Sequence, residues 1–216
     1  MPVDCPSSHI RLGLDFDNTI VLYDAVFRDL GKEAGLLPAG FSGGKRAVRD
    51  HIRSLPGGEG LWTALQARVY GPGIARAVPS PGLENFLARC RAGGVELFII
   101  SHKTAFAVAD PDGTNLRDAA RAWIAAHGLT DPERGAIPAE RVFFESTRAD
   151  KIDRIRTLGC THFVDDLDEV FREPAFPAHV RAYLYAPVPA AQSVESWRSV
   201  QSWMEVADDL FGCFTA

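Results

Sequence analysis

Short apolar segments alternate with longer amphipathic stretches along much of the chain, which is typical of a β-sheet covered by helices. The apolar residues of 10–14 predict a buried strand, and the nearly continuous apolar run at 95–100 predicts a strand covered on both faces. Shorter strands are expected at 141–144, 161–164 and 181–185. Because helical stretches separate these strands, we expect an α/β fold in which they pair in parallel through right-handed crossovers.

The segment 21–79 has a different pattern, because its apolar positions follow a helical period and no strand is evident. Apolar residues recur every four positions at its start, and further helices are expected at 45–55 and 59–70. Clusters of glycine and proline end these helices. We therefore predict a small all-helical unit at 21–79, inserted after the first strand of an α/β domain that comprises 1–20 and 80–216.

Capping residues and apolar faces predict the helices of the α/β domain. Ser80 is expected to cap a helix with Pro81 at its first position, and Thr147 is expected to open another helix. The periodicity of 116–127 predicts an amphipathic helix. The last helix is expected to carry apolar residues along one side, namely Trp197, Val200, Met204, Ala207 and Phe211.

Composition and charge argue against some classes of function. The chain has 216 residues, enough for one domain with a smaller insert. Its net charge of −5 argues against a general nucleic-acid-binding protein, which would show a basic excess. Residues 1–9 lack the features of a secretory leader, and no apolar run is long enough to span a membrane. The four scattered cysteines are expected to be free thiols, so we expect a cytoplasmic protein.

Polar side chains follow three of the predicted strands at the points where these strands end. They are Asp15, Asp17, Ser101, Asp165 and Asp166. Because ligands bind beyond the carboxyl ends of parallel strands, we expect these side chains to converge there with Lys151, which falls in the first turn of a helix. Clustered carboxylates need a compensating cation, and oxygen ligands without nearby His or Cys suit Mg²⁺. With a lysine and a hydroxyl, they predict a phosphate site with a metal and a carboxylate nucleophile.

Four motifs in this order resemble those of the haloacid dehalogenase-like (HAD) phosphohydrolase superfamily. The first is the segment 14–20, and the second is 99–101, a strand that ends in Ser. Lys151 corresponds to the third motif, and 163–166 corresponds to the fourth in its double-Asp form. The resemblance implies a three-layer, Rossmann-like parallel sheet, and it implies that 21–79 is a helical cap of the C1 type.

The resemblance also implies a role for each motif residue. Asp15 would attack phosphorus and form an aspartyl-phosphate. Asp17 would protonate the leaving alcohol and then activate the hydrolytic water. Ser101 would donate a hydrogen bond to a phosphoryl oxygen, and Lys151 would pair with the phosphoryl group and steady Asp15.

Mg²⁺ is the cofactor that the resemblance implies. Asp166 would bind it together with Asp15 and the carbonyl oxygen of Asp17, and Asp165 would bind it directly or through water. The family frequently has an acid four residues beyond Asp166, where this chain has Val170. The division of roles between Asp165 and Asp166 therefore stays open.

Substrate contacts are expected from residues beside the motifs and from the cap. The candidates are Asn18, Thr19, His102, Lys103, Arg46 and Arg49. Asn18 stands where the family commonly has glycine. The basic residues of the cap would meet an anionic leaving group, and the alternative for them is a solvated helix face. For His102 the alternative is a structural role.

The predicted function is Mg²⁺-dependent hydrolysis of a small phosphorylated metabolite. Asp17 favours phosphoester hydrolysis over dehalogenation, because a departing halide needs no acid, while phosphotransfer to a sugar stays open. A non-catalytic regulator with the same fold is a second hypothesis, against which the intact motif residues argue. A response-regulator receiver has similar residues in a different order along the chain. No nucleic-acid or membrane partner is expected, and the sequence gives neither the substrate nor the oligomeric state.

Overall fold

The computed structural model describes residues 9–109, 113–131, 136–186 and 196–212. Contacts divide the chain into two compact units. The sheet unit comprises the described parts of Met1–Ile20, Ser80–His102 and Gly128–Ala216. The helical unit comprises the described parts of Val21–Pro79 and Lys103–His127. Among the described residues, no helix combines the length and the apolar character needed to cross a membrane.

The sheet unit contains a six-stranded sheet in which every neighbouring pair of strands is parallel. Its strand order is β5-β4-β1-β6-β7-β8, so that β1 lies between β4 and β6. The strands are β1 (Arg11–Leu14), β4 (Glu96–His102), β5 (Val142–Glu145), β6 (His162–Asp165), β7 (Arg181–Tyr185) and β8 (Trp197–Val200). The predicted α/β fold with a parallel sheet is therefore confirmed.

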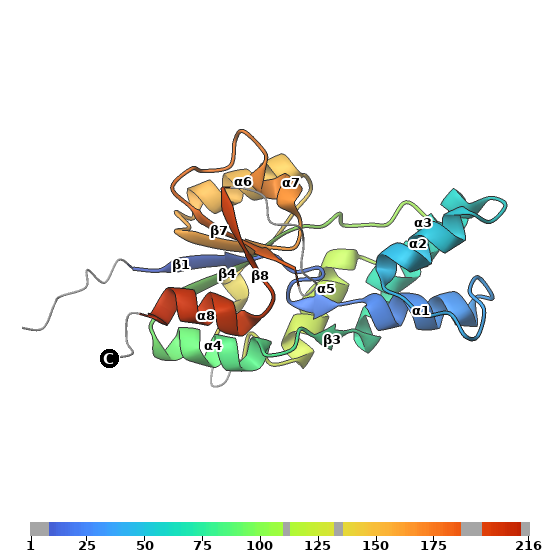
Figure 1. Ribbon diagram of the computed structural model, residues 1–216, viewed down its shortest axis with the longest axis horizontal. Coiled ribbons are helices and arrows are strands. Elements are labelled where there is room, and N and C mark those ends of the chain that lie inside the picture. Colours follow the sequence, from blue (N-terminus) through green and yellow to red (C-terminus); the bar gives the residue numbers. More distant parts are fainter. Residues whose placement is uncertain (1–8, 110–112, 132–135, 187–195, 213–216) are drawn as a thin grey trace, which may run out of the picture. The chain divides into compact units, whose positions relative to one another are not determined.

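Helices cover both faces of this sheet (Figure 1). On one face lie α6 (Arg148–Thr157) and α7 (Asp168–Phe171), and on the other lie α4 (Leu83–Ala92) and α8 (Trp203–Phe211). The short η2 (Ala139–Arg141) precedes β5. The core under α6 and α7 is apolar and includes Phe98, Ile100, Ile152, Ile155, Phe163 and Phe171. These residues are the inward faces of strands and helices, as the alternation along a strand requires.

A glycine in the central strand lets an aromatic ring pack against the sheet. Gly13 of β1 pairs in register with Phe163 of β6. A Cβ atom at position 13 would lie 2.5 Å from Cδ2 of the Phe163 ring. Because carbon atoms pack at about 3.5–4.0 Å, any larger residue would displace this ring.

The last predicted helix is wrong in its first half. Residues Trp197–Val200 form strand β8 beside β7, and the helix begins only at Trp203. Ser202 caps it, because its side chain accepts a hydrogen bond from the N–H of Glu205. Apolar residues three and four apart at 197–204 therefore span two elements, and the capping serine marks the boundary between them.

The capping role predicted for Ser80 is also wrong. Helix α4 begins at Leu83, after Gly82, whose φ of 82° lies in the left-handed region that favours glycine. The Ser80 hydroxyl is instead hydrogen-bonded to Tyr185 and Trp203 of the same unit. The hydroxyl that the local pattern predicted as a helix cap is therefore hydrogen-bonded to residues that are distant in the sequence.

The helical unit contains the predicted helices of 21–79 together with a pair of strands that was not predicted. Its elements are β2 (Val21–Leu22), α1 (Asp24–Glu33), α2 (Lys45–Arg53), α3 (Gly58–Tyr70), η1 (Pro72–Arg76), β3 (Val78–Pro79) and α5 (Leu116–Ala126). The two-residue strands β2 and β3 pair antiparallel, so this unit is not all-helical. Such short strands have no periodicity that a sequence pattern can detect.

The predicted amphipathic helix at 116–127 is confirmed as α5, and it groups with the helical unit. Its Trp123 donates a hydrogen bond through Nε1 to the carbonyl oxygen of Ala77 at 3.0 Å. The division of the chain into a core and a C1-type cap at 21–79 stays a prediction.

The buried glycine gives a test of packing in the sheet. We expect Gly13→Ala to lower the free energy of unfolding by about 1–3 kcal/mol, because the added methyl group overpacks the Phe163 ring. Urea denaturation followed by circular dichroism measures this loss. Gly212→Ala is the control, since a Cβ there meets nothing within 4 Å. Equal stability of the two variants would contradict this account of Gly13.

The two described cysteines give a test of burial. Cys90 and Cys160 are buried free thiols, and burial raises the pKa of each to about 12. Cys5 and Cys213 lie outside the described residues. In a Cys5→Ser/Cys213→Ser variant at pH 8, both remaining thiols stay protonated, so we expect no reaction with Ellman's reagent until denaturant is added. Rapid labelling of the folded variant would contradict the burial of these side chains.

Candidate active site

The predicted carboxylates of the sheet unit lie at the carboxyl ends of adjacent strands. Leu14 of β1 is level with Ile99 of β4 and with Val164 of β6. Asp15 follows β1 and donates a backbone hydrogen bond to the carbonyl oxygen of Val164 at 2.9 Å. Asp165 ends β6 and is therefore beside Asp15 at the same edge of the sheet. In open α/β sheets, ligands bind beyond the carboxyl ends of the strands. They bind at the point where the chain connections from two neighbouring strands lead in opposite directions.

A buried lysine joins the two carboxylates. Lys151 Nζ lies 2.5 Å from Asp15 Oδ1 and 2.7 Å from Asp165 Oδ2. The exposed fractions are 2% for Lys151, 5% for Asp15 and 0% for Asp165. The contact of Lys151 with Asp15 was predicted, and its contact with Asp165 was not. Asp15 directly after β1, Asp165 of β6 and Lys151 of α6 therefore form one ion-paired group away from water.

Helix α6 holds this lysine in place. Its first residue follows Thr147, whose side chain accepts a hydrogen bond from the N–H of Asp150 at 3.1 Å, as predicted. Lys151 lies in the first turn, where the helix dipole disfavours a positive charge. The two carboxylates compensate for this position, and the Phe163 ring, with its centroid 5.4 Å from Nζ, adds a cation–π contact.

Burial and neighbouring charges shift the pKa values in this group. Burial raises the pKa of Asp15 to about 7 against the lowering by Lys151, and the charge of Asp165 adds to the rise. For Lys151, burial alone would lower the pKa, but Asp15 and Asp165 outweigh it and raise the pKa above its ordinary value. The lysine is therefore charged at neutral pH. For Asp15, the positive charge of Lys151 does not fully offset the effects of burial and of the Asp165 charge, which both raise the pKa.

The residues present fit a hard divalent cation such as Mg²⁺. Asp15, Asp165 and Asp166 each offer a carboxylate oxygen, and these oxygens lie within 4.8 Å of one another. When all are ionised, three carboxylates and the single ammonium of Lys151 leave two negative charges. Carboxylate oxygens without His or Cys suit Mg²⁺ in preference to softer metals.

The two residues of the Asp pair have different surroundings. Asp165 is fully buried, and both of its oxygens accept hydrogen bonds, Oδ2 from Lys151 and Oδ1 from the N–H of Leu167 at 3.1 Å. Asp166 is half-buried. Both oxygens of Asp165 are therefore engaged, and the division of metal-binding roles between Asp165 and Asp166 stays a prediction.

The turn after β1 carries the other residues of the first motif. The N–H of Ile20 donates to the carbonyl oxygen of Phe16 at 3.0 Å, which closes the turn around Asp17. Asn18 has a φ of 61°, a left-handed conformation that Gly and Asn adopt more readily than other residues. Thr19 is buried, and its hydroxyl has no hydrogen-bond partner among the described residues.

Strand β4 brings Ser101 to this edge of the sheet. Ser101 is 1% exposed, and it pairs in register with Phe144. His102 is exposed, and its Nε2 lies 3.0 Å from the carbonyl oxygen of Ser146. Because neighbouring strand residues point to opposite faces, His102 points away from the side of Ser101. A substrate-binding role for His102 stays a prediction.

The remaining predicted contacts belong to the helical unit. Lys103 is buried, and its Nζ lies 5.0 Å from the ring centroid of Tyr70. Arg49 pairs with Asp50 at 2.8 Å, and Arg46 is exposed. Their contacts within this unit neither support nor exclude a role in substrate binding, which stays a prediction.

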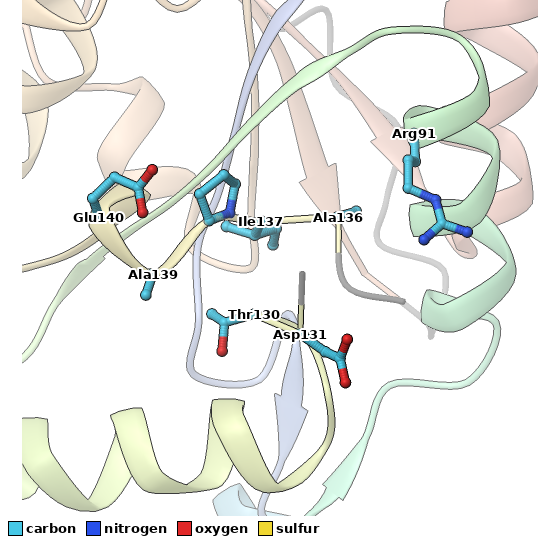
Figure 2. A pocket seen from close by; sticks show the side chains of 8 residues that line it. Arg91, Thr130, Asp131, Ala136, Ile137, Ala139 and Glu140 are labelled. Atoms are coloured by element: carbon cyan, nitrogen blue, oxygen red, sulfur yellow. The ribbon is translucent and has the colours of Figure 1, made fainter. Parts of the chain in front are cut away.

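Figure 2 shows a pocket that is lined by residues of the sheet unit. It has a volume of about 420 Å³, and its lining includes Arg91, Thr130 and Glu140. Arg91 is in the last turn of α4, and Glu140 is in η2, directly before β5 begins. The pocket therefore lies near the amino ends of the strands and is separate from the carboxylates.

Neither a protein-family model nor a curated protein matches the sequence. Solved structures show that the chain has the fold of the HAD-superfamily hydrolases, as the motifs predicted. A HAD-superfamily hydrolase of subfamily IA from Geobacter sulfurreducens is 16% identical. The alignment covers 94% of this chain and 97% of that chain, with a TM-score of 0.53.

Two further structures belong to the same group of similar proteins. A predicted phosphoglycolate phosphatase from Haemophilus somnus is 14% identical, with 94% of this chain and 98% of that chain covered and a TM-score of 0.56. A HAD-family hydrolase from Deinococcus radiodurans, with bound phosphate and sodium, is 14% identical, with 93% and 94% covered and a TM-score of 0.51. At these identities the similarity establishes the fold.

Binding of Mg²⁺ gives a test of the carboxylate cluster. We expect Mg²⁺ at ten times its Kd to stabilise the protein by about 1.4 kcal/mol, because a ligand of the folded state shifts unfolding by mass action. Asp166→Asn is expected to abolish this effect in thermal melts. Asp168→Asn is the matched control, since Asp168 pairs with Arg172 and lies outside the cluster. Stabilisation of the Asp166→Asn variant as large as that of wild type would contradict the proposed ligand set.

Proposed function

We propose that this protein is a Mg²⁺-dependent phosphoric monoester hydrolase that acts on a small phosphorylated metabolite. The observation that carries the proposal is the buried contact of Lys151 with Asp15 and Asp165 at the carboxyl ends of β1 and β6. Asp166 completes a set of oxygen ligands beside it. The similar structures support the proposal, because they include hydrolases, a predicted phosphoglycolate phosphatase and a protein with bound phosphate.

In the first step a carboxylate oxygen of Asp15 attacks phosphorus. The bond from Asp15 to phosphorus forms as the bond from phosphorus to the leaving oxygen breaks. Asp17 gives its proton to that oxygen, so that an alcohol departs and the enzyme holds an aspartyl-phosphate. Lys151 and Ser101 donate hydrogen bonds to phosphoryl oxygens and keep the group in line with Asp15.

In the second step water attacks the phosphorus of the aspartyl-phosphate. Asp17, now ionised, takes a proton from this water, and the bond between phosphorus and Asp15 breaks. Inorganic phosphate leaves, and both carboxyl groups return to their starting states. Mg²⁺, held by Asp15, Asp166 and the carbonyl oxygen of Asp17, would supply positive charge against the phosphoryl oxygens.

Substrate recognition is proposed for residues outside this catalytic set. Asn18 and Thr19 lie in the turn that carries Asp17, and His102 and Lys103 follow Ser101 along the chain. We assign 21–79 as the C1-type cap, with Arg46 and Arg49 as candidates for an anionic leaving group. The free thiols of the described cysteines favour the reducing cytoplasm as the compartment.

The nucleophile assignment is tested with Asp15→Asn. We expect this variant to lose about 10³-fold or more of the hydrolysis of p-nitrophenyl phosphate in the presence of Mg²⁺, because an amide oxygen is a poor nucleophile. The wild type, quenched in acid during turnover, is expected to gain the mass of one phosphoryl group on Asp15. Asp153→Asn, an exposed carboxylate on α6 that pairs with Arg156, is the control and keeps full activity. Unchanged activity of Asp15→Asn would refute the proposed nucleophile.

A further inference from the structure

Three side chains from distant segments of the sheet unit meet in a buried cluster. Trp203 Nε1 of α8 donates a hydrogen bond to Ser80 Oγ at 3.0 Å, and Ser80 Oγ is also hydrogen-bonded to Tyr185 Oη of β7 at 2.7 Å. The exposed fractions are 2% for Ser80, 4% for Tyr185 and 1% for Trp203. The Trp203 ring stacks on Tyr185 at 5.0 Å and on Phe86 at 4.8 Å. The side chain of Ser80 is therefore fixed by two rigid aromatic partners.

The backbone of Ser80 connects this cluster to the turn that carries Asp17. The N–H of Ser80 donates to the carbonyl oxygen of Ile20 at 2.8 Å, and the N–H of Ile20 donates to that of Phe16 at 3.0 Å. Asp17 thus lies inside a turn whose end is held by Ser80. The start of the turn is held by the backbone hydrogen bond from Asp15 to β6.

The backbone of the turn has an unusual conformation at one position. Thr19 is buried, but its hydroxyl has no hydrogen-bond partner among the described residues, and Asn18 is in a left-handed conformation. A left-handed residue other than glycine costs free energy, so the surroundings must hold such a turn in its shape. The hydrogen bonds of Ile20 to Phe16 and to Ser80 contribute to this support.

We propose that Ser80 is a positioning residue that holds the Asp17 turn in the geometry for protonating the leaving group, with Tyr185 and Trp203 fixing Ser80. This inference rests on the proposed function, in which Asp17 is the general acid. A general acid must lie within hydrogen-bond reach of the leaving oxygen, about 2.6–3.2 Å, so a small shift of the turn weakens proton transfer. Loss of the Ser80 hydroxyl also leaves the buried N–H of Trp203 without its acceptor, so we expect the segment at residue 80 to shift.

The test compares two substrates that differ in their need for an acid. p-Nitrophenolate leaves readily without a proton, whereas the alkoxide of glycerol 2-phosphate needs one. We expect Ser80→Ala to lower kcat for glycerol 2-phosphate about tenfold more than for p-nitrophenyl phosphate, a part of the 10²–10⁴-fold that a general acid contributes. Tyr185→Phe, which leaves the hydrogen bond from Trp203 in place, is expected to shift the ratio in the same direction by less.

A matched control separates positioning from stability. Thr161→Val removes a hydroxyl that accepts a hydrogen bond from the backbone N–H of Arg11 at 3.0 Å. Thr161 directly precedes β6, at the amino end of the strand, whereas the Asp17 turn lies at the carboxyl ends. We expect this variant to change kcat for both substrates by the same factor. In an Asp17→Asn background, Ser80→Ala is expected to add no further selective loss, because the acid is already absent.

The outcomes distinguish this inference from the proposed function. Equal losses on both substrates in Ser80→Ala, or an additive loss in the Asp17→Asn background, would overturn the positioning role alone. A wild-type protein inert toward both substrates would overturn the proposed function and the inference with it. If Ser80→Ala does not fold, the substrate ratio of Tyr185→Phe decides, and a ratio equal to that of wild type counts against the proposal.

Discussion

The contact of Lys151 with Asp15 and Asp165 is the interaction on which the candidate site depends. All three side chains are almost fully buried, so each has lost its hydration. Desolvating a charge costs several kcal/mol, and only close partners compensate for it. Removing one member would leave a buried charge without compensation, typically at a cost of about 3–5 kcal/mol. The group therefore requires β1, β6 and α6 to be held in one arrangement.

The packing of the sheet provides that arrangement. Gly13 has no side chain, so the ring of Phe163 lies against β1, and the same ring lies below the ammonium of Lys151. A residue of the strand interior thus supports the charged group at the end of the strand. The apolar face of α6, through Ile152 and Ile155, fixes the helix from which Lys151 extends. Apolar packing and ion pairing here reinforce each other, since neither places the lysine alone.

The sequence predicted those parts of the molecule that local patterns determine. The inner strands were predicted from their apolar runs. The start of α6 was predicted from the capping residue Thr147. Elements that depend on distant partners were missed: β8 because it lies within an apparent helical period, and the role of Ser80 because Tyr185 and Trp203 are more than a hundred residues away. The contact of Lys151 with Asp165 also depends on tertiary structure, because it forms only when the crossover from β5 through α6 to β6 is in place. The sequence alone did not explain the asparagine at position 18. Its left-handed backbone is a conformation that asparagine tolerates.

The charge of the site constrains how a substrate can bind. Lys151 already pairs with two carboxylates, so its single charge cannot also neutralise a phosphoryl group. A phosphate monoester carries about two negative charges at neutral pH and would meet Asp15, Asp165 and Asp166 at close range. Like charges at such distances repel strongly when water is excluded. Under the proposed function, a divalent cation held by these residues would offset this repulsion. It would also lower the pKa of Asp15 and so keep ionised the carboxylate that the proposed reaction uses as its nucleophile.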